Sequence, residues 1–303
     1  MQDPYVFPPP PGKVQTVAPG VRRILAPNPS AMTGPGTNTY LVGQEELAVI
    51  DPGPRDPHHL AAILDALAPD QRISHILVTH AHLDHSPLAR DLSRATGAPV
   101  LAHGDATAGR SEVMRHLASR ATLGGGEGVD SGFAPDVTLA DGETLSGRGW
   151  SLRAIWTPGH FGNHLCFATD DLVFTGDLVM GWSTSLVSPP DGDLTDFMAS
   201  CRKLQQLPAR LYLPGHGEVV AAPQARLDWL IRHRLEREAS LLAALATGPG
   251  SAAELAARVY TEIAPSLLPA ATRNVLAHLI DLQGKKLVRS RGVLDFHVIF
   301  ERS

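Results

Sequence analysis

The chain has 303 residues, 43% of them hydrophobic and 19% charged, with a formal net charge of −5, so it can bury a sizeable core and suits one large domain plus a small one. Its two cysteines are too few for a disulfide framework, and no apolar run reaches the roughly 18–20 residues that a bilayer-spanning helix needs. The N-terminus has neither the basic flank nor the apolar core of a signal peptide, so we expect a cytoplasmic enzyme without a membrane partner.

Short strands and helices alternate over the first hundred residues. The second expected strand ends in Asp51-Pro52-Gly53, and the second expected helix stops at Gly97, a typical helix-ending glycine. The elements expected here are strands at 39–42, 47–50 and 76–78 and helices at 59–67 and 86–95. This alternation, without internal repeats, predicts an α/β fold.

A dense group of potential metal ligands directly follows the apolar run at 76–78. Within six positions stand His80, His82, Asp84 and His85. Three imidazoles and a carboxylate side by side add little to a hydrophobic core, whereas histidine nitrogens and carboxylate oxygens are ligands that zinc and similar divalent ions prefer. Because loops at the ends of buried strands often carry chemistry, this group predicts a metal site.

Three further potential ligands stand downstream, each after a short apolar stretch and a turn containing glycine. They are His160, Asp177 and His216. Glycine lets the backbone approach closely, so these strand ends can all point to one place. The seven side chains together are enough for two metal ions, each with an open coordination position.

In this order the seven residues resemble the metallo-β-lactamase superfamily, and within it the glyoxalase II-like hydrolases, over roughly residues 35–220. The resemblance implies a four-layer αβ/βα sandwich, with two mixed sheets back to back and helices outside. It implies that Asp177 bridges two ions and that Asp51 supports the site from behind the ligands. The implied ligands of one ion are His80, His82 and His160, and those of the other are Asp84, His85 and His216.

The resemblance also implies the chemistry. Two divalent ions, zinc or else iron or manganese, would ionise a bridging water to hydroxide for attack on a substrate carbonyl or phosphorus. Asp84 would be both a ligand and the catalytic group that steers or receives the proton of that water. The β-lactamases proper usually carry Cys where this chain has Asp177, and diiron flavoproteins of this fold usually carry Glu where it has His82. Neither antibiotic hydrolysis nor oxygen reduction is therefore favoured.

Two stretches without a regular pattern are candidates for the surroundings of the site. Residues 180–193 form a long connection after Asp177, and we interpret it as either a substrate-facing wall or a plain surface loop. The glycine-rich stretch that begins at Gly124 could lie beside the active site.

The character of the chain changes after about residue 220, which predicts domains at 1–222 and 223–303. Ser251, with Glu254 three residues later, forms a capping box at a helix start. The expected elements are helices at 227–246, from 251, and at 269–282, then a hairpin of strands at 284–289 and 294–300. Three helices and a two-stranded wing resemble the winged-helix tail found in the single-stranded-RNA endonuclease branch of the superfamily.

The charge of this tail raises the question of nucleic-acid binding. Residues 226–303 carry a net charge of +3, against −8 for the rest of the chain. The wing concentrates four possible phosphate contacts: Lys285, Lys286, Arg289 and Arg291. The third helix, however, offers only Arg273, Asn274 and His278 as contacts, fewer than a specific reader usually needs. We therefore favour a module that packs beside the metal cleft and shapes it.

Four functions remain open from the sequence. The leading hypothesis is hydrolysis of a small-molecule carboxylic ester, thioester or lactone by a dinuclear metal site. The second is endoribonuclease action on single-stranded RNA. A third is a mononuclear iron persulfide dioxygenase, and a fourth, which the complete ligand set disfavours, is a catalytically silent interaction module.

Overall fold

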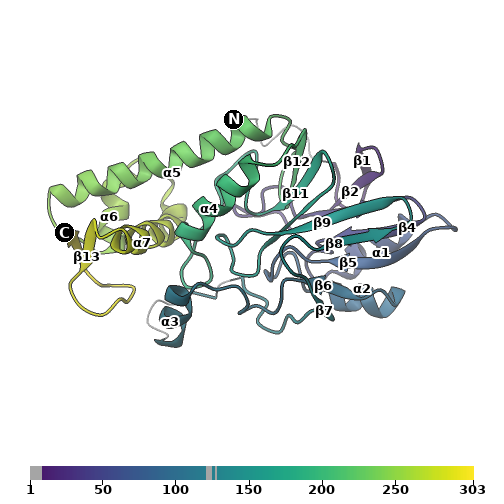
Figure 1. Ribbon diagram of the computed structural model, residues 1–303, viewed down its shortest axis with the longest axis horizontal. Helices are drawn as coiled ribbons and strands as arrows, with labels where there is room; N and C mark the ends of the chain where they lie inside the picture. The colour runs from purple at the N-terminus through teal and green to yellow at the C-terminus, as the bar shows by residue number, and fades with distance from the viewer. Residues whose placement is uncertain (1–8, 121–124, 127) are drawn as a thin grey trace.

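The structure is a computed structural model that describes residues 9–120, 125–126 and 128–303. Figure 1 shows an elongated molecule with two sheets packed together at one end and a group of helices at the other. Among the described residues, none of the helices combines the length and the apolar character that crossing a membrane would require.

The first sheet has seven strands that lie side by side in chain order. Neighbouring strands from β1 to β4 are antiparallel, whereas β4 to β7 are parallel, so the sheet is mixed. The strands are β1 (Val14–Ala18), β2 (Val21–Leu25), β3 (Asn38–Val42), β4 (Glu46–Ile50), β5 (Arg72–Leu77), β6 (Val100–Ala102) and β7 (Val137–Thr138).

The second sheet has five strands in the order β12-β11-β10-β9-β8. Only β11 and β12 pair in parallel, so their carboxyl ends lie at the same edge of the sheet. The strands are β8 (Thr144–Gly147), β9 (Trp150–Trp156), β10 (Leu165–Ala168), β11 (Leu172–Gly176) and β12 (Leu211–Pro214).

Apolar side chains on both faces of each sheet produce four layers. Tyr40 and Phe174 meet edge to face between the sheets, with ring centroids 5.2 Å apart. Helices α1 (Pro57–Asp65) and α2 (Ala89–Thr96) cover the outer face of the first sheet. Helices α4 (Leu194–Gln205) and α5 (Pro223–Ala246) cover that of the second. The expected αβ/βα sandwich is therefore confirmed.

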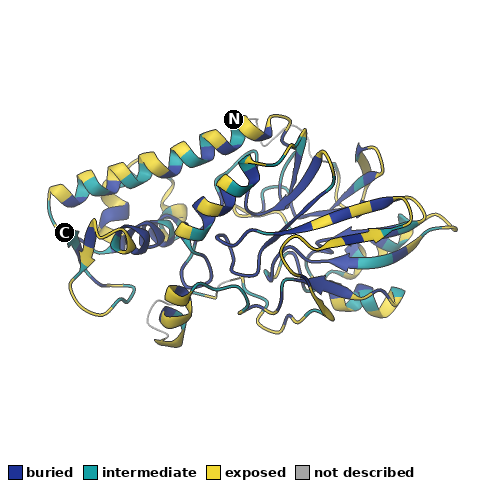
Figure 2. Cartoon of the chain, in the orientation of Figure 1, coloured by how far each residue is buried: buried dark blue, intermediate teal, exposed yellow. Residues whose placement is uncertain are grey.

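The helical end of the molecule has its own core, in which Leu255, Leu279 and Phe300 are fully buried. Ser251 and Glu254 form the predicted capping box at the start of α6. Figure 2 shows α7 buried over most of its length. The elements that form this core are α3 (Glu112–Arg120), α5, α6 (Ala252–Val259), α7 (Leu268–Gly284), β13 (Val288–Ser290) and β14 (Phe300–Arg302), with a 3-10 turn at Pro265–Leu267 before α7. The boundary at residues 222 and 223 stays a prediction.

Neither strand of the wing lies where the sequence predicted it. The first strand is shorter than the predicted 284–289, because α7 continues to Gly284 and β13 begins only at Val288. Strand β14 pairs with β13 only at 300–302, and residues 291–299 form an irregular connection. The apolar alternation at 294–298 resembles a strand, but the carboxylate of Asp295 accepts a hydrogen bond from the His297 amide at 2.8 Å. An aspartate that bonds the backbone two residues later favours a turn, and here it ends the extended chain.

Candidate metal centre

All seven predicted ligands lie at one edge of the sandwich. The ligands at 80–85 follow β5, His160 follows β9, Asp177 follows β11 and His216 follows β12. Three groups of these side chains have ligand atoms within 4.8 Å of one another, and such groups could hold a metal ion. The groups are His80, His82 and His160; His80, His85 and Asp177; and Asp84, His85 and His216.

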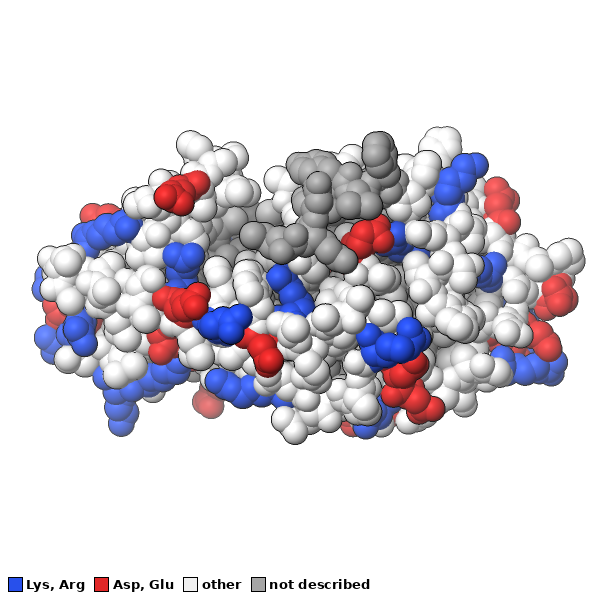
Figure 3. Space-filling model, turned by 90° about the horizontal axis from the view of Figure 1, so that it is seen from above, with Lys and Arg blue, Asp and Glu red and all other residues white. Residues whose placement is uncertain are grey.

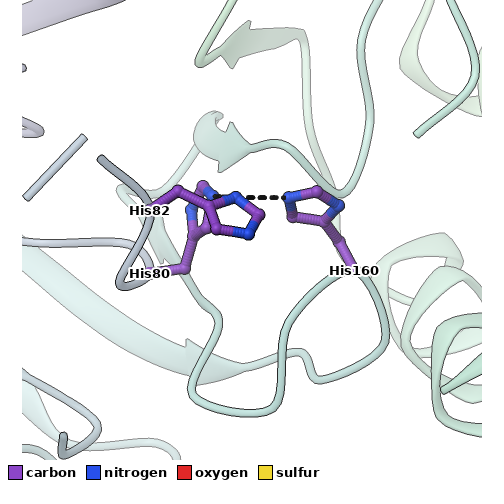
Figure 4. Close-up of side chains that lie close together, drawn as sticks. All are labelled: His80, His82 and His160. Atoms are coloured by element: carbon purple, nitrogen blue, oxygen red, sulfur yellow. Dashed lines mark hydrogen bonds between the residues drawn. The ribbon is translucent and has the colours of Figure 1, made fainter. Parts of the chain in front are cut away.

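The first group consists of three imidazoles whose nitrogens point toward one another (Figure 4). His82 Nδ1 lies 2.9 Å from His80 Nε2 and 3.2 Å from His160 Nε2. His160 Nδ1 donates a hydrogen bond to the Leu186 carbonyl at 2.6 Å, which leaves a lone pair on His160 Nε2. Burial lowers the pKa of all three imidazoles, that of His82 to about 3, so they are neutral and suited to bind a cation.

The second group combines two imidazoles with carboxylates. His216 Nε2 lies 3.1 Å from Asp84 Oδ2 and 3.2 Å from Asp177 Oδ2. Burial lowers the pKa of His216, but the carboxylates of Asp177 and Asp84 together outweigh burial and raise it to about 9. Burial likewise lowers the pKa of His85, but Asp84 and Asp177 hold it well above its usual value. Protons on these imidazoles therefore supply the positive charge that a metal ion would otherwise bring.

Asp177 lies between the two groups. Its Oδ2 is 3.8 Å from His160 Nε2, while its Oδ1 is buried and, among the described residues, has no hydrogen-bond partner. Burial raises the pKa of this carboxyl, but His216 and His85 hold it well below its usual range, so it is ionised. Burying an anionic oxygen that accepts no hydrogen bond costs free energy unless a cation lies beside it. The donor set of five imidazoles and two carboxylates therefore fits divalent metal ions.

The raised pKa of His216 gives a testable pH dependence. A pKa raised from 6.5 to about 9 stabilises the metal-free fold below pH 6.5, and this contribution is lost as the pH rises through 9. We expect the Tm of chelator-treated protein to fall across that range, by the equivalent of roughly 3 kcal/mol. A bound cation replaces the proton, so metal-loaded protein should keep its Tm. Parallel Tm curves for the two forms in thermal melts would contradict this expectation.

Asp51 anchors both groups from behind. Its Oδ2 accepts a hydrogen bond from His85 Nδ1 at 2.8 Å and another from Thr79 Oγ1 at 2.7 Å. Since the only hydroxyl hydrogen of Thr79 is used, its oxygen accepts from His80 Nδ1 at 2.9 Å. In this way one carboxylate fixes the ring orientation of His80 and of His85 and leaves each Nε2 free as a ligand atom.

Other residues around the ligands also support the site. Thr79 stands between the apolar run at 76–78 and the first ligand, and nothing in the pattern marks it as a supporting residue. A Cβ atom on Gly215 would lie 2.5 Å from Asp177 Oδ1, so only glycine fits before His216. His164, four residues after His160, accepts a hydrogen bond from the Asp177 amide at 3.3 Å.

The C-terminal helices also support the site, through the connection at 180–193. Asn274 of α7 accepts a hydrogen bond from the Val187 amide at 3.0 Å, and Arg234 of α5 donates to the Ser185 carbonyl at 2.5 Å. Leu186, which stands between Ser185 and Val187 in the chain, provides the carbonyl that orients His160. The C-terminal module is thereby linked to a candidate ligand.

Replacing Asn274 with alanine should weaken metal binding at the three-imidazole group. The Val187 amide would lose its acceptor and His160 its fixed orientation, and changes to such supporting partners typically cost about 10–100-fold in metal affinity. Gln283→Ala on the same helix is the control. Metal competition titrations measure the effect, and equal affinities for the two variants would contradict this role of Asn274.

A cavity of about 1100 Å³ lies between the three-imidazole group and the C-terminal module. His82 and His160 line one end of it, and residues of α7 and of the loop at 291–299 line the other. The 180–193 connection contributes Leu186, Ser188 and Asp191, so it forms a wall as one of the two interpretations expected. Gly126 also lines the cavity, whereas Gly124 lies outside the described residues.

The predicted nucleic-acid contacts are largely engaged in ion pairs. Lys285 pairs with Glu238 at 2.6 Å and Asp281 at 2.8 Å, and Arg289 and Arg291 both pair with Glu301. Figure 3 shows basic and acidic side chains interspersed over the visible face, without a continuous basic surface. On α7, Arg273 and His278 are buried. Helix α7, which would have to enter a groove of the nucleic acid, is therefore packed against the rest of the protein.

A four-layer sandwich with clustered imidazoles and carboxylates at one edge defines a class of hydrolases that can hold metal ions at that edge. The chain belongs to the metallo-β-lactamase superfamily, whose family model matches residues 32–216, and the protein is a hydrolase of this fold. The model for the beta-lactamase associated winged helix domain matches residues 251–293. The predicted family and the predicted winged helix are therefore both confirmed.

Curated relatives show similarity over most of the chain. A "Beta-lactamase-like protein 2 homolog" from Drosophila melanogaster is 31% identical over 290 residues, which cover 92% of this chain and 93% of the relative. An "Atrochrysone carboxyl ACP thioesterase" from Aspergillus fumigatus is 33% identical over 241 residues, which cover 77% of this chain and 67% of the relative. The fungal relative is thus matched over about two thirds of its length.

Two solved structures share the fold over nearly the whole chain. A beta-lactamase domain protein from Burkholderia ambifaria has a TM-score of 0.80 at 22% identity, with 99% of this chain and 96% of that chain covered. A metallo-beta-lactamase family protein from Thermus thermophilus has a TM-score of 0.76 at 26% identity, with 95% of this chain and 100% of that chain covered. Catalytic domain and C-terminal module therefore occur together in other proteins.

Proposed function

We propose that the protein hydrolyses carboxylic esters, and thioesters or lactones in particular, with two divalent ions held at the seven-residue centre. The observation that carries the proposal is the buried Asp177 carboxylate, which lies within 4 Å of imidazoles from both ligand groups and has one oxygen that, among the described residues, lies 3.6 Å from His85 Nε2 but accepts no hydrogen bond. A shared carboxylate between two ligand sets is what a dinuclear hydrolytic site requires.

Each side chain has a role in this proposal. His80, His82 and His160 hold one ion, Asp84, His85 and His216 hold the other, and Asp177 joins them. Zinc suits these ligands best, with iron or manganese as alternatives. When bound, the ions would lower the pKa of a coordinated water and polarise the substrate carbonyl.

Asp84 is the catalytic group of the chain itself. Its side chain is 26% exposed, more than that of His85, His216 or Asp177, so it can reach both solvent and substrate. Its Oδ2 accepts a hydrogen bond from Thr37 Oγ1 at 3.4 Å. Burial raises the pKa of Asp84, but His85 and His216 hold it below its usual range, so the carboxylate is ionised and can orient a water by accepting a hydrogen bond from it.

Three observations favour the ester-type reaction over its alternatives. Fungal relatives are named thioesterases. The wing cations that RNA cleavage would need are mostly paired with carboxylates. The second ligand group would have no function in a mononuclear iron dioxygenase, whose single ion needs only one such group.

A hydrolysis screen with protein of known metal content tests the proposal. The substrates are thioesters, oxygen esters, lactones, lactams and single-stranded RNA. We expect two ions per chain and thioester or ester turnover that rises with metal occupancy and is lost on chelation. Asp84→Asn serves as the inactive control, and Asp70→Asn, on the surface, as the active one. Cleavage of RNA alone, or one iron per chain with uptake of oxygen, would overturn the assignment.

A further inference from the structure

The cavity beside the three-imidazole group is mainly apolar where it meets the C-terminal module. From that module come Leu268 and Ala270 of α7 and Phe296 of the 291–299 loop. Leu186 and Met32 close it from the catalytic domain. Since His82 and His160 also line it, a carbonyl placed at the metal centre would have the rest of its acyl group in this space.

The charged groups of the cavity wall have partners of their own. Asp191 is bonded to Arg110 at 2.6 Å and accepts from the Gly126 amide at 3.0 Å. Arg273 lies over the ring of Phe296, with its guanidinium carbon 5.2 Å from the ring centroid. The wall therefore presents chiefly hydrocarbon to whatever occupies the cavity.

The position of the apolar wall is fixed. Asn274, one turn after Ala270, holds the Val187 amide, and Thr195 Oγ1 of α4 donates to Asp281 of α7 at 2.7 Å. The first hydrogen bond joins α7 to the connection that carries Leu186, and the second joins α7 to α4, which follows that connection. The distance between the two walls is thereby set by the fold.

We propose that this cavity binds a large apolar acyl group of the substrate and that Ala270 and Leu268 of the C-terminal module limit its size. This inference rests on the proposed ester or thioester hydrolysis and names its substrate class. A volume of about 1100 Å³ is at the upper end for small-molecule sites, so a short acyl group such as acetyl would leave most of the cavity unfilled.

A series of N-acetylcysteamine thioesters from acetyl to dodecanoyl tests the inference. Each buried methylene is worth up to about fourfold, so the six methylenes added from acetyl to octanoyl could raise kcat/KM by up to about 4000-fold, and we expect a rise of at least about 100-fold. Ala270→Trp fills the cavity and should lower octanoyl turnover by about tenfold or more while acetyl turnover stays within about twofold. Ala243→Trp, exposed on α5, is the matched control and should leave both unchanged.

A binding measurement separates this inference from the proposed function. Chelator-treated protein should bind decanoate with a measurable Kd by calorimetry and acetate not at all, and Ala270→Trp should abolish the decanoate signal. If no thioester is hydrolysed but decanoate still binds, the proposed function fails and the apolar site stands. If acetyl and octanoyl thioesters are hydrolysed equally well, or if decanoate does not bind, the apolar acyl site is refuted.

Discussion

Asp177→Ala should remove bound metal and hydrolysis together. The alanine leaves the two ligand groups without the carboxylate that lies between them, and His85 and His216 lose the anion that holds their pKa values high. Metal ions contribute several kcal/mol to such reactions, and each 1.36 kcal/mol is tenfold in rate, so we expect kcat/KM to fall by roughly 10³-fold or more.

The matched control for that variant is Asp171→Ala, in the exposed turn between β10 and β11, where the carboxylate pairs with Arg210. It should keep full metal content and full turnover. Elemental analysis, turnover and thermal melts on both variants decide the question. Full turnover by Asp177→Ala would show that Asp177 does not join the two ion sites.

The candidate ligands stand out in the sequence because their signal is local. His80, His82, Asp84 and His85 stand together, and each later ligand follows an apolar run and a glycine. The strand order then brings them to one edge. In the structure, β11 and β12 pair in parallel, so Asp177 and His216, which follow them, lie at the same edge. The layers were predictable for a similar reason, since the strands and helices carry regular apolar patterns.

The supporting network could not be predicted because it depends on pairings distant in sequence. Thr79 and Asp51 are 28 residues apart, and Asn274 is 87 residues from Val187. Nothing in the sequence around Asn274 shows whether this residue supports the connection at 180–193 or contacts a phosphate. The strand at 300–302 was missed because the Asp295 turn overrides an apolar alternation, a competition between side-chain hydrogen bonding and periodicity.

The internal hydrogen bonds of α7 change the meaning of the winged helix. In a winged helix that binds nucleic acid the third helix projects outward. Here Arg273 and His278 are buried, and Asn274 accepts a hydrogen bond from the connection at 180–193. The same module supplies one wall of the cavity. Its role in this chain is therefore best understood through the cavity that it helps to enclose.

Asp51→Asn should lower metal affinity and turnover about 10–100-fold, although Asp51 touches no metal ion. Asparagine tolerates the left-handed backbone at this position (φ 51°) and keeps the size of the side chain, so the fold should persist. The amide, however, offers a single acceptor oxygen where the carboxylate serves the Thr79 amide, Thr79 Oγ1 and His85 Nδ1. An NH2 group facing His85 would favour the tautomer with hydrogen on Nε2, which removes the lone pair that a cation needs. Metal competition titrations measure the effect, thermal melts verify folding, and Asp70→Asn is the control. Unchanged affinity in a folded Asp51→Asn variant would show that the carboxylate does not set the His85 tautomer.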